Sequence, residues 1–200
     1  RLSLVGSEMC IRDSLIVGCL GGLFTLSSCT APTNVKDYSA YVNPFIGTGG
    51  HGHTFPGAVV PHGMIQPSPD TRIDGWDACS GYYYADSTIN GFSHTHVSGT
   101  GCCDYGDVLL MPTVGKQQYR TTDPQSQRLA YASSFSHKNE IAEPGYYSVF
   151  LDTYQVKAEI SSTKRGAIHR YTFPENAESG FIIDLDYLSL IHISEPTRLR

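Results

Sequence analysis

The chain has 200 residues, a formal net charge of −5 and only 16% charged residues, so it lacks the basic surface that a nucleic-acid partner requires. Its length and its hydrophobic content of 40% are enough for one domain with a real core. The composition therefore predicts a globular domain with no nucleic-acid partner, and its function must be sought in the motifs.

The two ends of the chain carry related peptides. Residues 4–14 read LVGSEMCIRDS and residues 188–198 read LSLIHISEPTR, and one DNA sequence read on its two strands can encode both. That DNA resembles a transposon-type sequencing adapter. We therefore interpret residues 1–14 and 188–200 as adapter-like artefacts, expect the natural sequence to be truncated at both ends, and leave them out of the fold prediction.

Residues 15–29 form an apolar, uncharged segment that is too short for a membrane span and typical of a signal peptide. Its end, LSSC, resembles a bacterial lipobox in which Cys29 is lipidated. Cys19 follows a similar sequence, but the polar tether, residues 30–40, begins only after Cys29. We predict an exported lipoprotein, in the periplasm or on the outer-membrane surface, that contacts the membrane through its lipid anchor only.

Three cysteines remain in the mature part, Cys79, Cys102 and Cys103. One disulfide could form in an oxidising compartment, but an odd number of cysteines predicts no disulfide framework. The vicinal pair is more typical of packing than of redox chemistry, and without a CxxC motif a thiol enzyme is not indicated.

The segment 42–115 holds five of the eight histidines and the only tryptophan, with one arginine and neither lysine nor glutamate. Its residues turn the backbone, offer hydrogen bonds or present flat rings, which indicates a binding surface built from loops. Residues 47–52 (GTGGHG) match GxGxxG, but no strand and helix flank them, so a dinucleotide site is rejected. The glycines instead favour a ligand-lining loop.

Two His-x-His pairs, His51 with His53 and His94 with His96, have the spacing of metal ligands. On strands, each pair would point both imidazoles to one face, and the two pairs could form a four-nitrogen site. Structural and hydrogen-bonding histidines are commoner, and no glutamate lies near to complete the ligand set. We therefore predict no metal ligand among them and favour contacts to a polar ligand.

Trp76 lies between Gly75 and Asp77 and is followed by three tyrosines. Sugar rings stack on aromatic faces while carboxylates bond their hydroxyls, so this sequence favours a carbohydrate contact, although a single tryptophan is often a core residue. A catalytic carboxyl pair could come from the aspartates, but turn-capping explains most of them, and none is named as acid or base. These aspartates are Asp70, Asp74, Asp77, Asp86, Asp104 and Asp107.

Alternating apolar residues predict strands at 108–111, 146–154, 155–161, 166–173 and 180–186, with a turn at 163–166. Pro112 is expected to end the first of these strands, and the polar segment 116–139 is expected to be a long excursion or lid. No segment has a sustained helical period. The predicted fold is mainly β, an antiparallel β-sandwich.

Three pieces of the sequence, in order and without large gaps, carry a family resemblance: VNPFIGTGGHGHTFPGAVVPHGMIQPSPDTR, GWDACSGYYYADSTINGFSHTHVSGTG and DYGDVLLMPTVG. They resemble the N-terminal domain of glycoside hydrolase family 92, exported α-mannosidases of gut Bacteroidetes. The resemblance covers residues 41–187. It implies an N-terminal β-sandwich followed by a helical (α/α)₆ domain, and calcium-dependent, inverting, exo-acting hydrolysis of α-mannosides from glycoprotein glycans or mannan.

The resemblance also implies a division of labour, because in this family the catalytic acid and base and most calcium ligands belong to the helical domain, which this chain lacks. No catalytic residue is therefore expected here, and the chain alone is expected to be inactive. The implied roles are stacking for Trp76, hydroxyl contacts for Arg72 and Asp77, and orientation for the histidines. The implied sugar-site residues are Gly49, His51, His53, Arg72, Trp76, Asp77, His94 and His96.

Two alternatives to the mannosidase hypothesis stay open. The first is a free-standing lipoprotein sandwich that binds glycan without cleaving it. The second, less favoured, is a histidine-based metalloenzyme.

Overall fold

The computed structural model describes residues 36–73, 75–99, 101, 105–116, 129–185 and 187. Apart from Lys36 and Asp37, these residues belong to one compact unit, Tyr38–Arg200. The signal segment, Cys29, most of the tether and the adapter-like peptides lie outside the described residues. No helix within the described ranges is long and apolar enough to cross a membrane.

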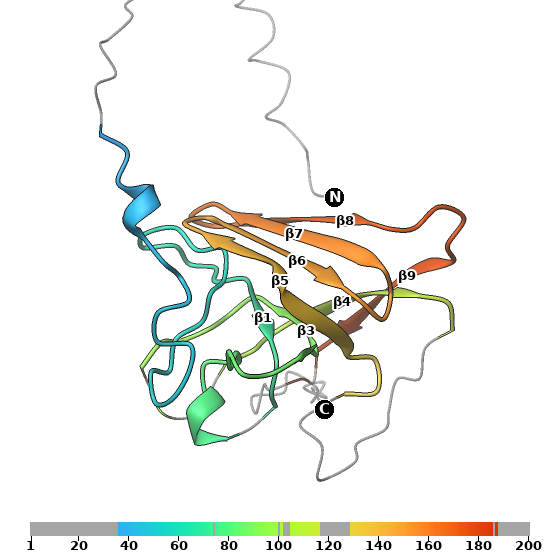
Figure 1. Cartoon of the computed structure of the whole chain (residues 1–200), viewed down its shortest axis with the longest axis horizontal. Coiled ribbons are helices and arrows are strands. Elements are labelled where there is room, and N and C mark those ends of the chain that lie inside the picture. The colour runs from blue at the N-terminus through green and yellow to red at the C-terminus, as the bar shows by residue number, and fades with distance from the viewer. Residues whose placement is uncertain are drawn as a thin grey trace, which may run out of the picture. The chain divides into compact units, whose positions relative to one another are not determined.

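The unit consists of two antiparallel sheets, which Figure 1 shows one above the other. The four-stranded sheet has the order β1 (Ser68–Asp70), β3 (Gly91–Ser93), β4 (Leu109–Val114) and β9 (Ser179–Asp184). The five-stranded sheet has the order β2 (Thr88–Ile89), β5 (Ser133–Glu143), β6 (Tyr146–Leu151), β7 (Val156–Ser162) and β8 (Ala167–Thr172). Two short 3-10 helices, η2 (Ser39–Tyr41) and η3 (Trp76–Ala78), lie in the loops. The predicted mainly-β, antiparallel two-sheet fold is confirmed.

One apolar core joins the two sheets. Alternation along β6 and β7 turns every second side chain inward, so Tyr147, Val149, Leu151, Val156, Ala158 and Ile160 are buried. They share a cluster with Phe92 of β3, Leu109 and Met111 of β4, and Ile182 of β9. The rings of Phe92 and Tyr147 lie 6.4 Å apart between their centroids and connect the two layers.

The second half of the unit follows its sequence pattern closely. The expected turn at 163–166 closes with a hydrogen bond from the Thr163 amide to the Gly166 carbonyl, 2.8 Å. β7 and β8 then pair in register from Lys157 with Thr172 to Ser162 with Ala167. The expected strands at 146–154 and 155–161 are shorter at their junction, because residues 152–155 form the turn between β6 and β7.

The prediction that Pro112 ends its strand is wrong. β4 continues to Val114, and Pro112 pairs with Phe181 of β9. Proline has no N–H to donate, so a strand tolerates it at a position where no neighbouring strand needs that hydrogen bond. β3 pairs with β4 only at Phe92 and Leu110, so the ladder on that side ends before Pro112.

The interpretation of residues 116–139 as an excursion or lid is also wrong in part. Residues 133–139 belong to β5, which pairs with β2 and β6, whereas residues 117–128 lie outside the described part. The sequence pattern missed this strand for a local reason. The register shifts between Phe135 and Glu140, and the bulge interrupts the alternation that would have identified a strand.

Candidate functional site

Residues 45–55 form a compact loop that carries His51 and His53. The loop doubles back on itself so tightly that a Cβ at Gly52 would lie 2.1 Å from the Gly47 carbonyl oxygen. Only glycine fits there, which explains the glycine spacing. In the described residues that flank this loop, 36–44 and 56–67, there is neither a strand nor an α-helix.

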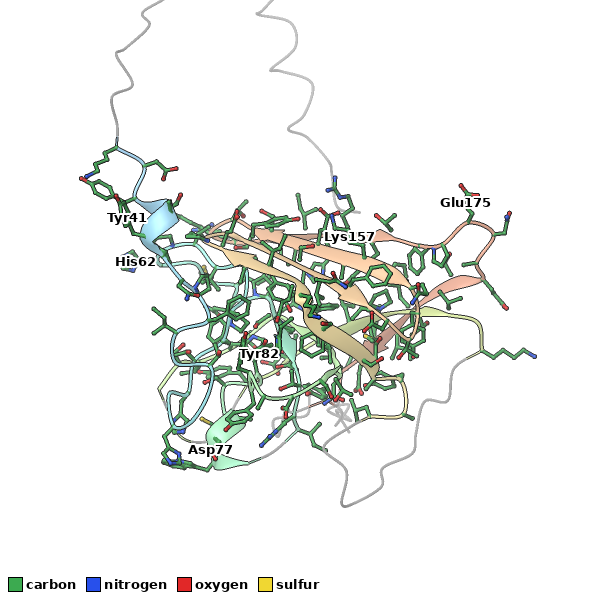
Figure 2. All side chains as sticks on the ribbon, viewed as in Figure 1. Tyr41, His62, Asp77, Tyr82, Lys157 and Glu175 are labelled. Carbon is green, nitrogen blue, oxygen red and sulfur yellow. The ribbon has the colours of Figure 1, made fainter. Side chains whose placement is uncertain are left out.

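The exposed imidazole of His51 meets the carboxylate of Asp77 from a separate part of the chain. Nδ1 of His51 lies 2.6 Å from Oδ1 of Asp77, and the two side chains are 80% and 38% exposed. Asp77 is placed by η3, whose preceding residue, Gly75, has a φ of 107° that favours glycine. Figure 2 shows Asp77 at the edge of the unit remote from Lys157 on β7.

Trp76 lies beside this pair and is 62% exposed, so it is not a core residue. Its ring packs edge-to-face against the imidazole of His53, with 4.8 Å between centroids. It also lies close to Gly101, where an added Cβ would be 2.6 Å from the Trp76 ring. The ring is therefore held in place with one surface in solvent. We call His51, His53, Trp76 and Asp77 the His51–Trp76 cluster.

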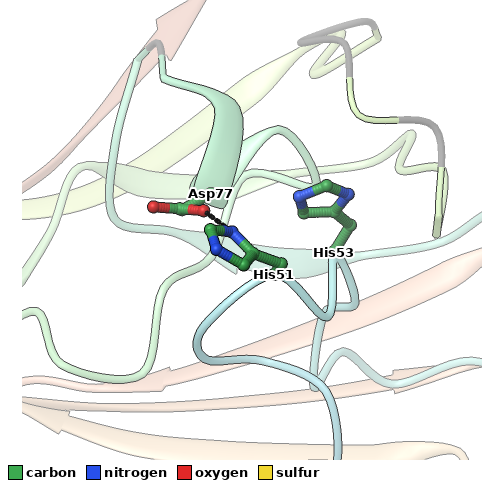
Figure 3. Close-up of side chains that lie close together, drawn as sticks. All are labelled: His51, His53 and Asp77. Carbon is green, nitrogen blue, oxygen red and sulfur yellow. Dashed lines mark hydrogen bonds and ion pairs between the residues drawn. The ribbon is translucent and has the colours of Figure 1, made fainter.

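His53 is the buried member of the cluster. It is 8% exposed, and its Nε2 has no hydrogen-bond partner among the residues that the structure describes. Figure 3 shows its ring turned toward the His51–Asp77 pair, and one ligand atom from each of the three residues lies within 4.8 Å of the others. Within the described ranges this is the only such group of three histidine, cysteine or acidic side chains. The four-nitrogen alternative considered from the sequence is not formed by the described residues, since both His-x-His pairs lie in loops rather than on strands.

The donor set of this cluster does not fit calcium. Calcium takes six to eight oxygen ligands, whereas the cluster offers two imidazole nitrogens and one carboxylate. No step of the proposed chemistry is therefore placed on a calcium ion held by these residues.

Arg72 is committed to a different partner. Its Nε and Nη2 each donate to Asp86, at 2.8 Å to Oδ2 and Oδ1, and its guanidinium lies 4.4 Å from the centroid of the Tyr83 ring. The hydrogen bonds to Asp86 raise the pKa of Arg72. A bidentate pair of this kind fixes the loop after β1, and sugar contact by Arg72 stays a prediction.

His96 is buried with Asp70. Nε2 of His96 lies 2.8 Å from Oδ1 of Asp70 and 3.1 Å from Oγ of Ser93, while Nδ1 lies 2.7 Å from the Gln66 carbonyl. These are the residue types of a catalytic triad, but serine and aspartate meet the same nitrogen, whereas a triad needs them on opposite nitrogens. Both side chains are at most 2% exposed, so the arrangement is structural.

His94 belongs to a hydrogen-bonded chain between the two sheets. Its Nδ1 donates to the Val108 carbonyl, 2.7 Å, and its Nε2 lies 3.1 Å from Nε2 of His169 on β8. Nδ1 of His169 lies 2.8 Å from the Tyr171 hydroxyl. A carbonyl only accepts, so His94 carries its proton on Nδ1, His169 donates to it, and Tyr171 donates to His169. Burial, and next the neighbouring His94, lower the pKa of His169 to about 4.

Both nitrogens of His94 and of His96 are thus bonded within the protein, and their sugar contacts stay predictions. The sequence analysis did not identify His169. Its inward orientation could have been predicted from the alternation of the strand. Along β8 the exposed residues alternate with Ala167, His169 and Tyr171, which form the inward face.

The remaining aspartates have structural contacts. Asp86 accepts from Thr71 and Arg72, and Asp107 accepts from the Thr95 hydroxyl at 3.0 Å. Asp74, Asp104, Cys102 and Cys103 lie outside the described residues. Cys79 is a buried free thiol.

A two-sheet β unit that exposes a tryptophan beside a carboxylate and an imidazole has the features of a carbohydrate-active domain. Residues 41–195 match the glycosyl hydrolase family 92 N-terminal domain, and the chain belongs to this family of glycosidases. The expected resemblance is confirmed.

Known relatives place this domain at the front of a longer chain. A family GH92 α-mannosidase from Bacteroides thetaiotaomicron, solved with mannoimidazole, shares 44% identity and a TM-score of 0.70, over 74% of this chain and 20% of its own. A GH92 inverting mannosidase from strain VPI-5482 of that species shares 33% identity and a TM-score of 0.61 over the same fractions. An uncharacterized secreted glycosidase of Arthroderma benhamiae is 31% identical over 80% of this chain and 20% of its own length. The chain thus spans about one fifth of these relatives.

Proposed function

We propose that this chain forms one wall of the sugar site of an exported, inverting exo-α-mannosidase. The observation that carries the proposal is the exposed Trp76 ring, which packs against His53 and lies close to Gly101, beside the His51–Asp77 pair. The 44% identity to a GH92 α-mannosidase, and the likeness to an inverting GH92 mannosidase, support the substrate class and the stereochemistry.

Each member of the His51–Trp76 cluster has a distinct role in this proposal. Trp76 stacks on the C–H face of a mannose ring, while Asp77 and His51 bond its hydroxyls. His53 orients the tryptophan, and Gly49, exposed at the start of the same turn, allows close approach of the sugar. Arg72, His94 and His96 act behind this surface by fixing the loops that carry it.

The chemical step is assigned to residues outside this chain. Inverting hydrolysis needs two carboxyl groups on opposite sides of the scissile bond. Asp70, Asp77, Asp86 and Asp107 each contact a histidine, arginine or threonine side chain, which supports placing the acid and base in a helical domain that follows. Calcium, as an aid to sugar binding, is proposed for that domain as well, because the cluster offers a single carboxylate as its oxygen ligand.

The test compares this chain with the complete protein to which it belongs. The complete protein should release mannose from α-mannosides with inversion, and NMR of the released anomer measures this. This chain alone should release no mannose. Trp76→Ala in the complete protein should lower kcat/KM at least on the order of 100-fold, or about 3 kcal/mol. Tyr41→Ala, which removes an aromatic ring that is 76% exposed outside the cluster, should leave kcat/KM unchanged.

Mannose release by this chain alone would refute the assignment of catalysis to the missing part. Equal effects of the Trp76 and Tyr41 substitutions would refute the sugar-stacking role. A complete protein that binds glycan but cleaves none would favour the alternative of a glycan-binding lipoprotein sandwich.

Membrane attachment is proposed through the lipid on Cys29, and the secreted relative supports export. A bacterial host grown with a labelled fatty acid should incorporate label into the wild-type protein and not into Cys29→Ser. If Cys29→Ser still incorporates the label and Cys19→Ser does not, the lipidated residue is Cys19.

A further inference from the structure

We propose that His51, His53 and Asp77 form a binding site for a divalent transition-metal ion of the zinc type. This site differs from the sequence-based expectation of no metal ligand, because it combines one His-x-His pair with a carboxylate from a distant segment. Two imidazoles and one carboxylate are the ligand types of open zinc sites, in which water takes the fourth position.

The unpartnered nitrogen of His53 is the observation that points to a ligand. The residue is 92% buried, as its 8% exposure implies, and a buried imidazole nitrogen without a partner is costly. His53 also has a φ of 53°, a left-handed backbone conformation that residues other than glycine rarely adopt. This geometry turns the ring toward His51 and Asp77 (Figure 3). A metal bound to Nε2 would satisfy it.

The geometry requires only a small adjustment. Ligand atoms bound to one tetrahedral zinc lie about 3.3 Å apart, given metal–ligand bonds of about 2.0–2.1 Å. The three ligand atoms here lie within 4.8 Å of one another, and Nδ1 of His51 already lies 2.6 Å from Asp77. His51 can move, because its side chain is 80% exposed and the preceding Gly50 lies in open space. A Cβ at Gly50 would meet none of the described residues within 4 Å.

The same donor set selects against the hard cations. Calcium and magnesium require oxygen ligands in larger number, and imidazole nitrogen is a ligand for zinc, copper and nickel. The site is therefore distinct from the calcium expected for the helical domain, and it shares His51 and Asp77 with the proposed sugar contact.

Isothermal titration of this chain with Zn²⁺ tests the proposal, with emission from Trp76, the only tryptophan, as a local reporter. Trp76 emission is expected to change as zinc binds, since its ring lies 4.8 Å from that of His53. His53→Gln and His51→Gln should each weaken the zinc-dependent change at least on the order of tenfold. His62→Gln is the matched control, because His62 is exposed and outside the cluster, and it should bind as the wild type does.

Cysteine thiolates are also zinc ligands. The test therefore depends on how the variants respond and not on the zinc stoichiometry. His53 is buried and its substitution can disturb the fold, whereas His51 is exposed, so His51→Gln decides alone if His53→Gln unfolds. The proposal is overturned if zinc leaves Trp76 emission unchanged, or if His51→Gln responds to zinc with the wild-type affinity. Calcium in place of zinc should produce no change, and a calcium response lost in His51→Gln would equally overturn the zinc-type assignment.

Discussion

The loop-rich part of the unit, residues 45–96, and the strand-rich part, residues 133–172, bury different kinds of side chain. In β6 and β7 the fully buried residues are mainly apolar, among them Val149, Leu151 and Val156. In the loop-rich part many are polar, and the buried set includes Thr48, His53, Ser68, Asp70, Thr71, Ser80, Asn90, Ser93 and His96.

The difference follows from how each part satisfies its backbone. Long strands bond their N–H and C=O groups to each other, so their side chains are free to be apolar. Irregular backbone needs side-chain partners: the Thr71 hydroxyl accepts from the Tyr83 amide, and Oδ1 of Asn90 accepts from the Leu129 amide. A loop surface can carry exposed binding groups because buried polar side chains hold it in place.

The largest effect is expected from the strand-rich part. Leu151→Ala removes a fully buried side chain from the common core and should lower the free energy of unfolding by about 3–4 kcal/mol. Urea unfolding measures this. Ile168→Ala on β8 is the matched control, since Ile168 is 72% exposed, and should change it by less than about 0.5 kcal/mol. Similar losses in both variants would contradict the assignment of the core.

Asp70→Ala should have the next largest effect and should act on the loop-rich part. It leaves the buried Nε2 of His96 with Ser93 alone, at an expected cost of about 3 kcal/mol in the free energy of unfolding. Asp152→Ala, in the turn after β6, should be nearly neutral. Hydrogen exchange should show faster opening around Gln66 and Ser93 than in β6 and β7. A neutral Asp70→Ala would show that buried polar contacts do not hold the loops.

The same contrast explains what could be predicted from the sequence. Alternation identified β6, β7, β8 and β9 with small boundary errors, because an apolar core imposes a period of two. β1, β2 and β3 have two or three residues each, too few for any period. Pairing in the loop-rich part depends on contacts such as that of Asp70 with His96, 26 residues apart, which local patterns do not encode.

The candidate site was predictable to the same extent. Residue types suited to a sugar surface identified His51, His53, Trp76 and Asp77, which the structure brings together. The same residue types also selected His94 and His96, which are bonded internally. Histidines with both nitrogens bonded inside the protein and histidines with a nitrogen left over look alike in sequence, and only the position of their partners in the structure separates them.

A smaller effect depends on pH and tests the link between the sheets. The pKa of His169 is lowered to about 4 by burial, whereas an imidazole in the unfolded chain titrates near 6.5. The unfolded state therefore binds more protons between these values, and stability is fully present above about pH 6.5 and lost as pH falls toward 4. After allowance for partial exposure we expect a loss of about 2 kcal/mol.

Urea unfolding at pH 7 and pH 4.5 measures this loss. His169→Gln should flatten the dependence, because glutamine does not titrate, whereas His62→Gln, at an exposed position, should keep the wild-type slope. Equal slopes in wild type and His169→Gln would exclude the titration of buried His169 as the cause.

The smallest effect separates backbone strain from contact with the tryptophan. Gly99 and Gly101 both have positive φ, +78° and +68°, so an alanine at either position should cost about 1 kcal/mol of unfolding free energy. A Cβ at Gly99 would meet nothing within 4 Å, whereas one at Gly101 would lie 2.6 Å from the Trp76 ring. Gly101→Ala alone should therefore shift Trp76 emission and weaken the zinc response. If both variants leave emission unchanged, the backbone of Gly101 does not position Trp76, and His53 must hold the ring alone.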